Sequence, residues 1–277
     1  MSKKSKGNLN AGEVISKGVD ISLSNLKNLG ILAIIFQFIP MIITSLMGIS
    51  FAVSTVRMVS EYHYKVSLFA DISIILLLMA AIGIWTTLGN FASIKLIHKR
   101  NNNEEMTWRE AMKFALSKVG KVILFMIFTF ILVIVFSVAL GLLGSIGTMI
   151  IAGLSKLSAF LGALLGILGV IGIIVIVICL TMYIIFMQQG IVIRELSVWE
   201  SFKYSISMVN GRLFNVFTKE LLVWIIAIIA GLVLNLLNLI PFIGPIIMII
   251  GSVIIAIYET VCNTVIFDDY DQCHKNI

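Results

Sequence analysis

Charged side chains are scarce in this chain of 277 residues: they make up 12% of the sequence, whereas hydrophobic residues make up 60%. Soluble globular domains carry about a quarter charged residues and are roughly half apolar. The mean hydropathy of +1.09 reflects the same excess of apolar residues. The composition therefore excludes an ordinary soluble domain and predicts an all-α, polytopic membrane helix bundle.

Residues that build catalytic and metal sites are also few. The three cysteines have no metal-ligand spacing and no paired pattern, and the three histidines fall in separate segments. There is no phosphate-binding loop, no dinucleotide fingerprint and no nucleophile elbow. We therefore expect no disulfide, no metal, no cofactor and no enzymatic activity. We expect the net charge of +6 to orient the chain and meet anionic lipid rather than to bind nucleic acid.

Six apolar runs are each about as long as the roughly 20 residues that a helix needs to cross a bilayer. They cover residues 29–53, 70–94, 122–144, 165–188, 221–240 and 244–267. Gln37 and Pro40 predict a kink in the first run, and PFIGP (241–245) predicts a turn before the last. Residues 145–164 fit an interfacial helix, a re-entrant segment or extensions of the flanking helices, and we favour extensions.

Lys and Arg are distributed unevenly around these runs. Six spans put both ends of the chain on one side, and only Arg57, Lys65 and Lys156 of the 20 Lys and Arg residues then fall on the other. Because Lys and Arg resist translocation, the side that carries most of them is predicted to be cytoplasmic. We expect a multi-pass protein of the cell membrane with both termini in the cytoplasm. The abundance of Ile, Lys and Asn is typical of an AT-rich bacterial genome.

Three short segments with one apolar face precede successive pairs of spans, at about 12–28, 107–120 and 197–214. Aligning Glu110 with Glu200 matches EAMKFALSKV to ESFKYSISMV, and the first segment is a weaker copy. The chain is therefore predicted to consist of three similar units, each an amphipathic helix followed by two spans. Asn210-Gly211 should break the third helix before span five.

These amphipathic helices are predicted to lie at the cytoplasmic interface, where Trp and Lys or Arg favour headgroups. The alternative is that they only seat the spans. The candidates for contact with lipid or with a membrane or cytoplasmic protein partner are Trp108, Lys113, Lys118, Trp199, Lys203 and Arg212.

Few polar residues lie inside the spans, and charged ones there are costly. Glu259 is the best candidate, either as a substrate or proton site or in a structural pair with Lys203, Arg212 or Lys219. Polar side chains could line a path or hold helices together; they include Gln37, Asn235 and Asn238. Close helix packing explains the glycines at 162, 166, 169 and 172.

The segment WESFKYSISMVNGRLF resembles the pattern E-A-L-x-x-S-x-x-L-x-K-G-R of bacterial six-span proteins. That group comprises the membrane domain of glycerophosphoryl diester phosphodiesterases and the related YciC-like family. TVIFDDYDQ is similar to the family's exit from its last span, where an aromatic–Asp pair is common. The resemblance implies a six-span layout but carries no phosphodiesterase residue, because the family's hydrolase is a separate soluble domain that we do not expect here. The matching positions are Glu200, Ser201, Phe202, Ser205, Gly211 and Arg212.

Two functions remain open from these observations. The first is a non-catalytic accessory, scaffold or lipid-interacting membrane protein, which fits the absence of catalytic motifs and the three interfacial helices. The second is a transporter for a lipid or another amphipathic solute, which fits the repeated span pairs. An intramembrane hydrolase is a distant third.

Overall fold

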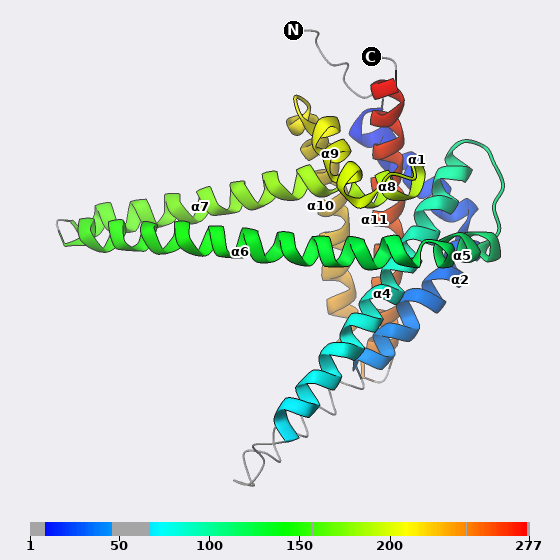
Figure 1. Cartoon of the computed structure of the whole chain (residues 1–277), viewed down its shortest axis with the longest axis horizontal. Coiled ribbons are helices and arrows are strands. Elements are labelled where there is room, and N and C mark those ends of the chain that lie inside the picture. Colours follow the sequence, from blue (N-terminus) through cyan, green and yellow to red (C-terminus); the bar gives the residue numbers. More distant parts are fainter. Residues whose placement is uncertain (1–8, 46–66, 157, 242, 276–277) are drawn as a thin grey trace.

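The computed structural model describes residues 9–45, 67–156, 158–241 and 243–275, and these residues are helical with short connections (Figure 1). Six of its helical segments are long and apolar enough to cross a membrane. The protein is thus an all-α, polytopic membrane helix bundle, as predicted. Its helices are α1 (Ala11–Ser24), α2 (Leu26–Ala33), η1 (Ile34–Phe38), α4 (Ser67–Asn101), α5 (Trp108–Ser117), α6 (Val119–Ser155), α7 (Ala159–Ile184), α8 (Met187–Ile193), α9 (Val198–Val209), α10 (Leu213–Leu237) and α11 (Gly244–Lys275).

Each predicted apolar run corresponds to one of these segments. The segments are Leu26–Ser45, Ile75–Asn101, Val119–Gly153, Ala159–Ile193, Leu213–Leu237 and Gly244–Cys273. The end of the first predicted span, 46–53, lies outside the described residues, as do Arg57 and Lys65. PFIGP falls in the connection between α10 and α11, as expected.

The first span changes from α-helix to π-helix at η1, two residues before Pro40. The N–H of Ile39 donates to the carbonyl of Ile34, five residues back. Proline has no N–H to continue the α-helical pattern, and π segments inside helices commonly relieve such an interruption. The structure thus shows a π-helical interruption near Gln37 and Pro40, where the sequence predicted a kink.

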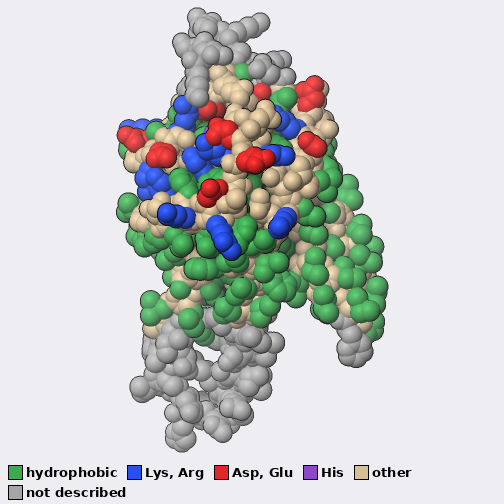
Figure 2. All heavy atoms as spheres, turned by 90° about the vertical axis from the view of Figure 1, so that its right-hand side faces the viewer, with side chains coloured by type: hydrophobic (Ala, Val, Ile, Leu, Met, Phe, Trp, Pro, Cys, Tyr) green, Lys and Arg blue, Asp and Glu red, His purple; other side chains and the backbone are tan. Residues whose placement is uncertain are grey.

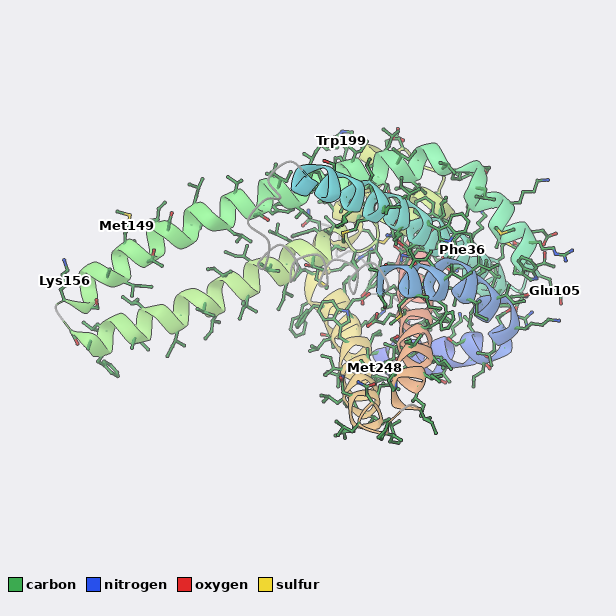
Figure 3. All side chains as sticks on the ribbon, turned by 90° about the horizontal axis from the view of Figure 1, so that it is seen from below. Phe36, Glu105, Met149, Lys156, Trp199 and Met248 are labelled. Carbon is green, nitrogen blue, oxygen red and sulfur yellow. The ribbon has the colours of Figure 1, made fainter. Side chains whose placement is uncertain are left out.

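Residues 145–155 extend α6, and α7 begins at Ala159, so the predicted helical extension is confirmed. At 1.5 Å per residue, the 35-residue apolar segment of α6, Val119–Gly153, is roughly 52 Å long, and the 26 residues of α7 are roughly 39 Å long. A hydrocarbon core is only about 30 Å thick, so such helices must tilt steeply to stay inside it. Figure 1 shows the α6–α7 hairpin projecting away from the α10–α11 pair, and Figure 3 shows Met149 and Lys156 far out along it.

The three amphipathic segments form α1, α5 and α9, and all three begin with the same capping box. Asn10, Thr107 and Ser197 each accept a hydrogen bond from the backbone N–H of the glutamate three residues later, and that glutamate accepts one in return. A capping box fixes the start of a helix by satisfying two N–H groups. The third helix ends as predicted, because Gly211 adopts φ 81°.

Each amphipathic helix packs on the last span of the unit before it. α5 packs on α4, α9 packs on α8 and α7, and α1 packs on α11. The first unit thereby contacts the third, and the three units close into a ring. The positions one and five residues after the capping-box glutamate are buried in every copy: Val14 and Gly18, Ala111 and Ala115, Ser201 and Ser205.

We call this end of the molecule the base; it comprises α1, α5, α8, α9 and the adjoining ends of α4, α10 and α11. Most large, fully buried side chains lie there, including Phe91, Phe186, Phe267 and Tyr270. The rings of Phe186 and Phe267 meet edge to face at 5.9 Å. In Figure 2, Lys, Arg, Asp and Glu side chains gather on the base, and hydrophobic side chains cover the described surface beyond it.

Candidate functional site

Three aspartates near the end of α11 form a buried carboxylate cluster: Asp268, Asp269 and Asp271. Asp268 accepts hydrogen bonds from Asn101 Nδ2 and lies against His98 Nδ1, both at 2.7 Å and both from α4. Asp269 pairs with Lys219 of α10 at 2.8 Å. Asp268 and Asp269 of α11 therefore contact two other helices, α4 and α10.

The third aspartate joins the middle unit to the last. Asp271 accepts a hydrogen bond from Arg194 Nε at 2.7 Å and another from the Tyr204 hydroxyl. Burial, together with the bond to Asp271, raises the pKa of Tyr204 to about 12. The phenol therefore stays protonated and remains a donor at every physiological pH.

Each aspartate of the cluster has a hydrogen-bonding partner, which is the condition under which charges are tolerated in an apolar interior. Between the aspartates, the Tyr270 ring has Lys219 Nζ 4.4 Å and Arg212 Cζ 5.7 Å from its centroid. Within the described residues, the buried Arg212 guanidinium forms no hydrogen bond. Asp269 also accepts a hydrogen bond from the backbone N–H of Leu9 at 3.3 Å, so the carboxylate cluster connects α11 to α4, to α10 and to the segment just before α1. The sequence signal for it was the run of three acids in DDYD directly after a span.

A groove of about 390 Å³ lies between α10 and α11, below the base. Its walls are mostly apolar, and Glu259 is the one formally charged residue among those that line it: Trp224, Ala227, Ile228, Gly231, Ser252, Ile255 and Glu259. Within the described residues, Glu259 forms no ion pair. The expected pairing with Lys219 is not found, because Lys219 is held by Asp269.

A second glutamate, Glu220, is fully buried close to this groove. The Asn263 amide nitrogen lies 3.0 and 2.8 Å from its two carboxyl oxygens in the orientation that satisfies both groups. Glu220 likewise forms no ion pair within the part of the chain that the structure describes. Acidic side chains inside apolar helices are costly, so two of them without an ion-pair partner are candidates for a binding site. The predicted span 221–240 begins directly after Glu220, so the sequence indicated Glu259 as a charge inside a span but did not indicate Glu220.

A further cavity, of about 310 Å³, lies on the other side of α11 and shares Ser252 with the groove. Gln37, Thr44 and Thr86 are among the residues that line it. Within the described residues, the buried Gln37 side-chain oxygen accepts no hydrogen bond. Whether Gln37 lines a path or holds helices together stays a prediction.

The two asparagines do not join this site. Asn235 is exposed and donates to the Gly231 carbonyl of its own helix at 2.9 Å, and Asn238 is the exposed C-cap of α10. Among the described residues, neither side chain forms a hydrogen bond to another helix, and a role in lining a path stays a prediction. The glycines of α7 divide: a Cβ at Gly162 would lie 2.7 Å from the Ser155 side chain, so close packing explains this one as predicted, whereas a Cβ at 166, 169 or 172 would meet nothing within 4 Å.

The predicted interfacial residues divide into two groups. Trp199 is exposed and stacks with Phe202, and Lys203 Nζ lies 5.1 Å from the Trp199 ring centroid. Trp108 is half-buried and Lys113 is exposed, so these four remain on the surface, as predicted.

The other two basic residues contact other side chains of the protein. Lys118 is paired with Glu195 at 3.2 Å, and this contact lowers the pKa of Glu195. Arg212 was predicted to meet lipid headgroups, but only 2% of it is exposed, because its guanidinium packs over Tyr270 inside the base. The Arg212 prediction is wrong, because its burial depends on Tyr270 of α11, which lies far from it in the sequence.

The six apolar helices and the charged base define a multi-pass membrane protein. A family model, described as a domain of unknown function (DUF7847), matches residues 109–267. The match spans more than half of the chain, so the chain belongs to this family. It begins in α5 and ends in α11, and thus covers the second and third units. Neither the curated proteins nor the solved structures contain a match, and nothing in these comparisons links the chain to the phosphodiesterase membrane domain.

Proposed function

We propose that this protein is a non-catalytic membrane protein that binds a lipid or another amphipathic molecule in the α10–α11 groove. The observation that carries the proposal is Glu259, a carboxylate without an ion-pair partner among the described residues, in an otherwise apolar groove. An acyl chain fits the apolar walls, and a hydroxyl or amine would bond the carboxylate. In this proposal the base faces the cytoplasm, where most of the Lys and Arg residues then lie.

The resemblance to the phosphodiesterase membrane domain enters the proposal as a shared six-span layout and nothing more. The exposed surface of α5 and α9 supports an accessory role beside lipid binding. Trp199, Lys113 and Lys203 are available there to a headgroup or to a protein partner.

The test is native mass spectrometry of the full chain purified in mild detergent from its own membrane. We expect a bound lipid that Glu259→Gln removes, with an occupancy at least about tenfold lower, since the bond to a charged acceptor is lost. Asn235→Ala is the matched control: it removes a polar side chain from the same hairpin outside the groove. Equal lipid occupancy in wild type and Glu259→Gln would refute the groove as the binding site.

A transporter for the same kind of molecule is the second candidate, and the cavity on the other side of α11 favours it. Because Ser252 lines both spaces, a molecule could pass between them around α11. Proteoliposomes with a fluorescent lipid in one leaflet separate the two functions. A binding protein leaves the leaflet exchange rate at its protein-free value, whereas a transporter raises it and Glu259→Gln reduces that increase.

A further inference from the structure

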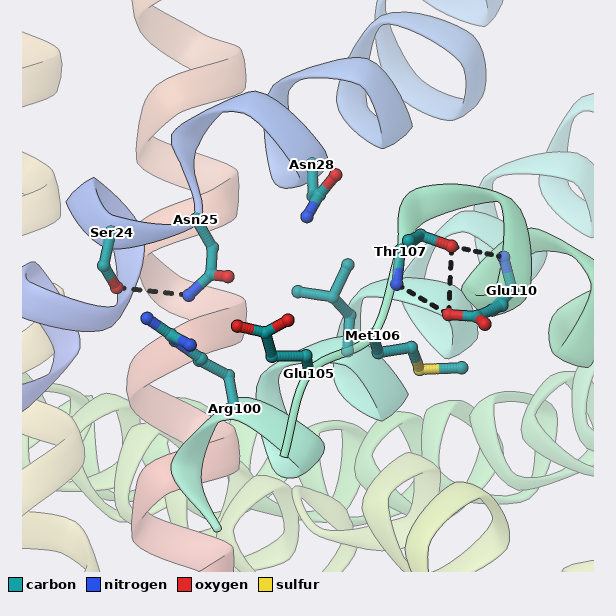
Figure 4. Close-up of a pocket in the computed structure, with 9 residues that line it drawn as sticks. Ser24, Asn25, Asn28, Arg100, Glu105, Met106, Thr107 and Glu110 are labelled. Carbon is teal, nitrogen blue, oxygen red and sulfur yellow. Dashed lines mark hydrogen bonds between the residues drawn. The ribbon is translucent and has the colours of Figure 1, made fainter. Parts of the chain in front are cut away.

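A polar cavity of about 480 Å³ opens in the base, separate from the α10–α11 groove (Figure 4). It lies where the junction of α1 and α2, the end of α4 and the start of α5 meet. Its volume is within the range of small-molecule sites. The residues around it are Ser24, Asn25, Asn28, Leu96, Arg100, Glu105, Met106, Thr107 and Glu110.

Two opposite charges share this cavity without pairing. Figure 4 shows the side chains of Arg100 and Glu105 both reaching the space beside Asn25 and Asn28. Within the described residues, neither Arg100 nor Glu105 forms an ion pair. By contrast, the residues directly before them, Lys99 and Glu104, form an ion pair with one another. The chain thus carries two neighbouring charge pairs, one closed and one held open across a cavity.

The other polar groups of the cavity are partly engaged. Glu110 is taken by its capping box, where it accepts bonds from Thr107. The Asn25 amide nitrogen donates to the Ile21 carbonyl at 3.1 Å and to Ser24 Oγ at 3.2 Å, which leaves its oxygen toward the cavity. A ligand would therefore meet the Arg100 guanidinium, the Glu105 carboxylate, the capped carboxylate of Glu110 and amide groups.

We propose that this cavity binds a small zwitterion that carries a phosphate and an ammonium group, as in phosphoethanolamine. Arg100 takes the phosphate, since a guanidinium matches its oxygens with two parallel hydrogen bonds, and Glu105 takes the ammonium. A ligand with a single charge would leave the other cavity charge unmatched, so the pair selects against simple anions and simple cations. The same chemistry occurs on a lipid headgroup and on a free metabolite. This site uses no residue of the α10–α11 groove, so the two binding proposals are tested independently.

The test measures binding of soluble phosphoethanolamine to the full chain by titration calorimetry in phosphatidylglycerol nanodiscs, because that headgroup carries no ammonium. We expect wild type to bind it at least about tenfold more tightly than inorganic phosphate or ethanolamine alone, because each charge-assisted contact adds to the other. Glu105→Gln should bind phosphoethanolamine no better than phosphate, and Arg100→Gln no better than ethanolamine. Arg100→Lys keeps the charge but loses the paired hydrogen bonds, so it should retain only part of the preference, and this partial binding shows that the cavity still folds.

The closed pair supplies the controls. Lys99→Gln and Glu104→Gln remove the neighbouring charges and should leave the preference for the zwitterion unchanged. Adding phosphatidylethanolamine to the nanodiscs identifies the source: competition with the soluble probe shows a lipid headgroup, and its absence shows a free zwitterion. The proposal is overturned if wild type binds phosphoethanolamine no better than its separate halves, or if Glu105→Gln and Glu104→Gln behave alike.

Discussion

The base and the α6–α7 hairpin have similar apolar side chains in opposite environments. In the base, Phe186 and Phe267 are completely buried, whereas Phe130 and Phe160 of the hairpin expose 66% and 75% of their surface. The base also contains the buried ion pairs, whereas the formal charges of the hairpin are Lys121, near the start of α6, and Lys156, between α6 and α7. Hydrophobicity alone therefore does not decide which helices pack together in this protein.

The difference follows from what each region can bond to. In lipid, apolar side chains gain little from leaving one apolar environment for another, so association needs close packing or polar contacts. The base has both: small residues at the helix crossings and the carboxylate cluster. Among the glycines of α7, only Gly162 packs closely on another element, at Ser155 of α6, and a Cβ at Gly166, Gly169 or Gly172 would meet nothing within 4 Å in the described structure. Units are thus joined where polar contacts exist, and the long hairpin meets the bilayer directly.

The largest effect should come from breaking a buried ion pair of the base. Lys219→Met leaves Asp269 as a buried charge without its cation, and such losses cost about 3–5 kcal/mol. Thermal unfolding in detergent, followed by tryptophan fluorescence, measures the change. Lys99→Met removes the cation of the exposed pair with Glu104 and should lower the stability far less, because exposed ion pairs contribute little. Similar losses for both would show that the base is not held by buried charges.

A smaller effect should come from adding one methyl group in each region. A Cβ at Gly190 would lie 2.3 Å from Ser201 Oγ, and that hydroxyl donates to the Met187 carbonyl. Gly190→Ala should therefore cost about 1–3 kcal/mol. Gly169→Ala in the hairpin meets nothing within 4 Å and should be neutral or stabilising by up to about 1 kcal/mol, since alanine favours helix. Unfolding of the two variants side by side distinguishes the regions, and an equal response would remove the distinction.

The smallest effect should be the acid sensitivity of the capping boxes. Hydrogen bonds from the backbone and side chain of Ser197 lower the pKa of Glu200 below 4.5, and those from Thr107 do the same for Glu110. Because the pKa of each carboxylate is lower in the folded state, its stabilisation of the fold is complete above pH 4.5. That stabilisation is lost as the pH falls through the folded-state pKa. Wild type should lose thermal stability below that pH more steeply than the Glu110→Gln, Glu200→Gln double variant. Parallel pH curves would contradict the role of these carboxylates.

Sequence periodicity was sufficient for the local structure. The runs of apolar residues located the six spans, and the repeat around Glu110 and Glu200 located the amphipathic helices, because both signals depend only on near neighbours in the chain. Pro40 and Asn210-Gly211 marked the distortion and the break for the same reason: each changes the backbone at its own position.

The contacts between units could not be read in this way. That α1 packs on α11 depends on residues far apart in the chain, and no local pattern encodes it. Arg212 looked like an interfacial residue because it follows an amphipathic helix, but its burial depends on Tyr270 of α11. Glu259 stood out as a charge inside an apolar run, whereas Arg100 and Glu105 looked like ordinary loop charges until the cavity between them was known.

The closure of the three units into one base is the central claim, and a single engineered disulfide tests it most directly. A Cβ built on Gly18 lies 3.9 Å from the Cβ of Cys262, which is the spacing of a disulfide. Gly18→Cys, oxidised in membranes, should yield a linked peptide joining residues 18 and 262 by mass spectrometry. Gly30→Cys, which meets nothing within 4 Å, should not form this link. A failure of Gly18→Cys to link to Cys262, or linkage equal to that of Gly30→Cys, would show that the first helix does not close onto the last span.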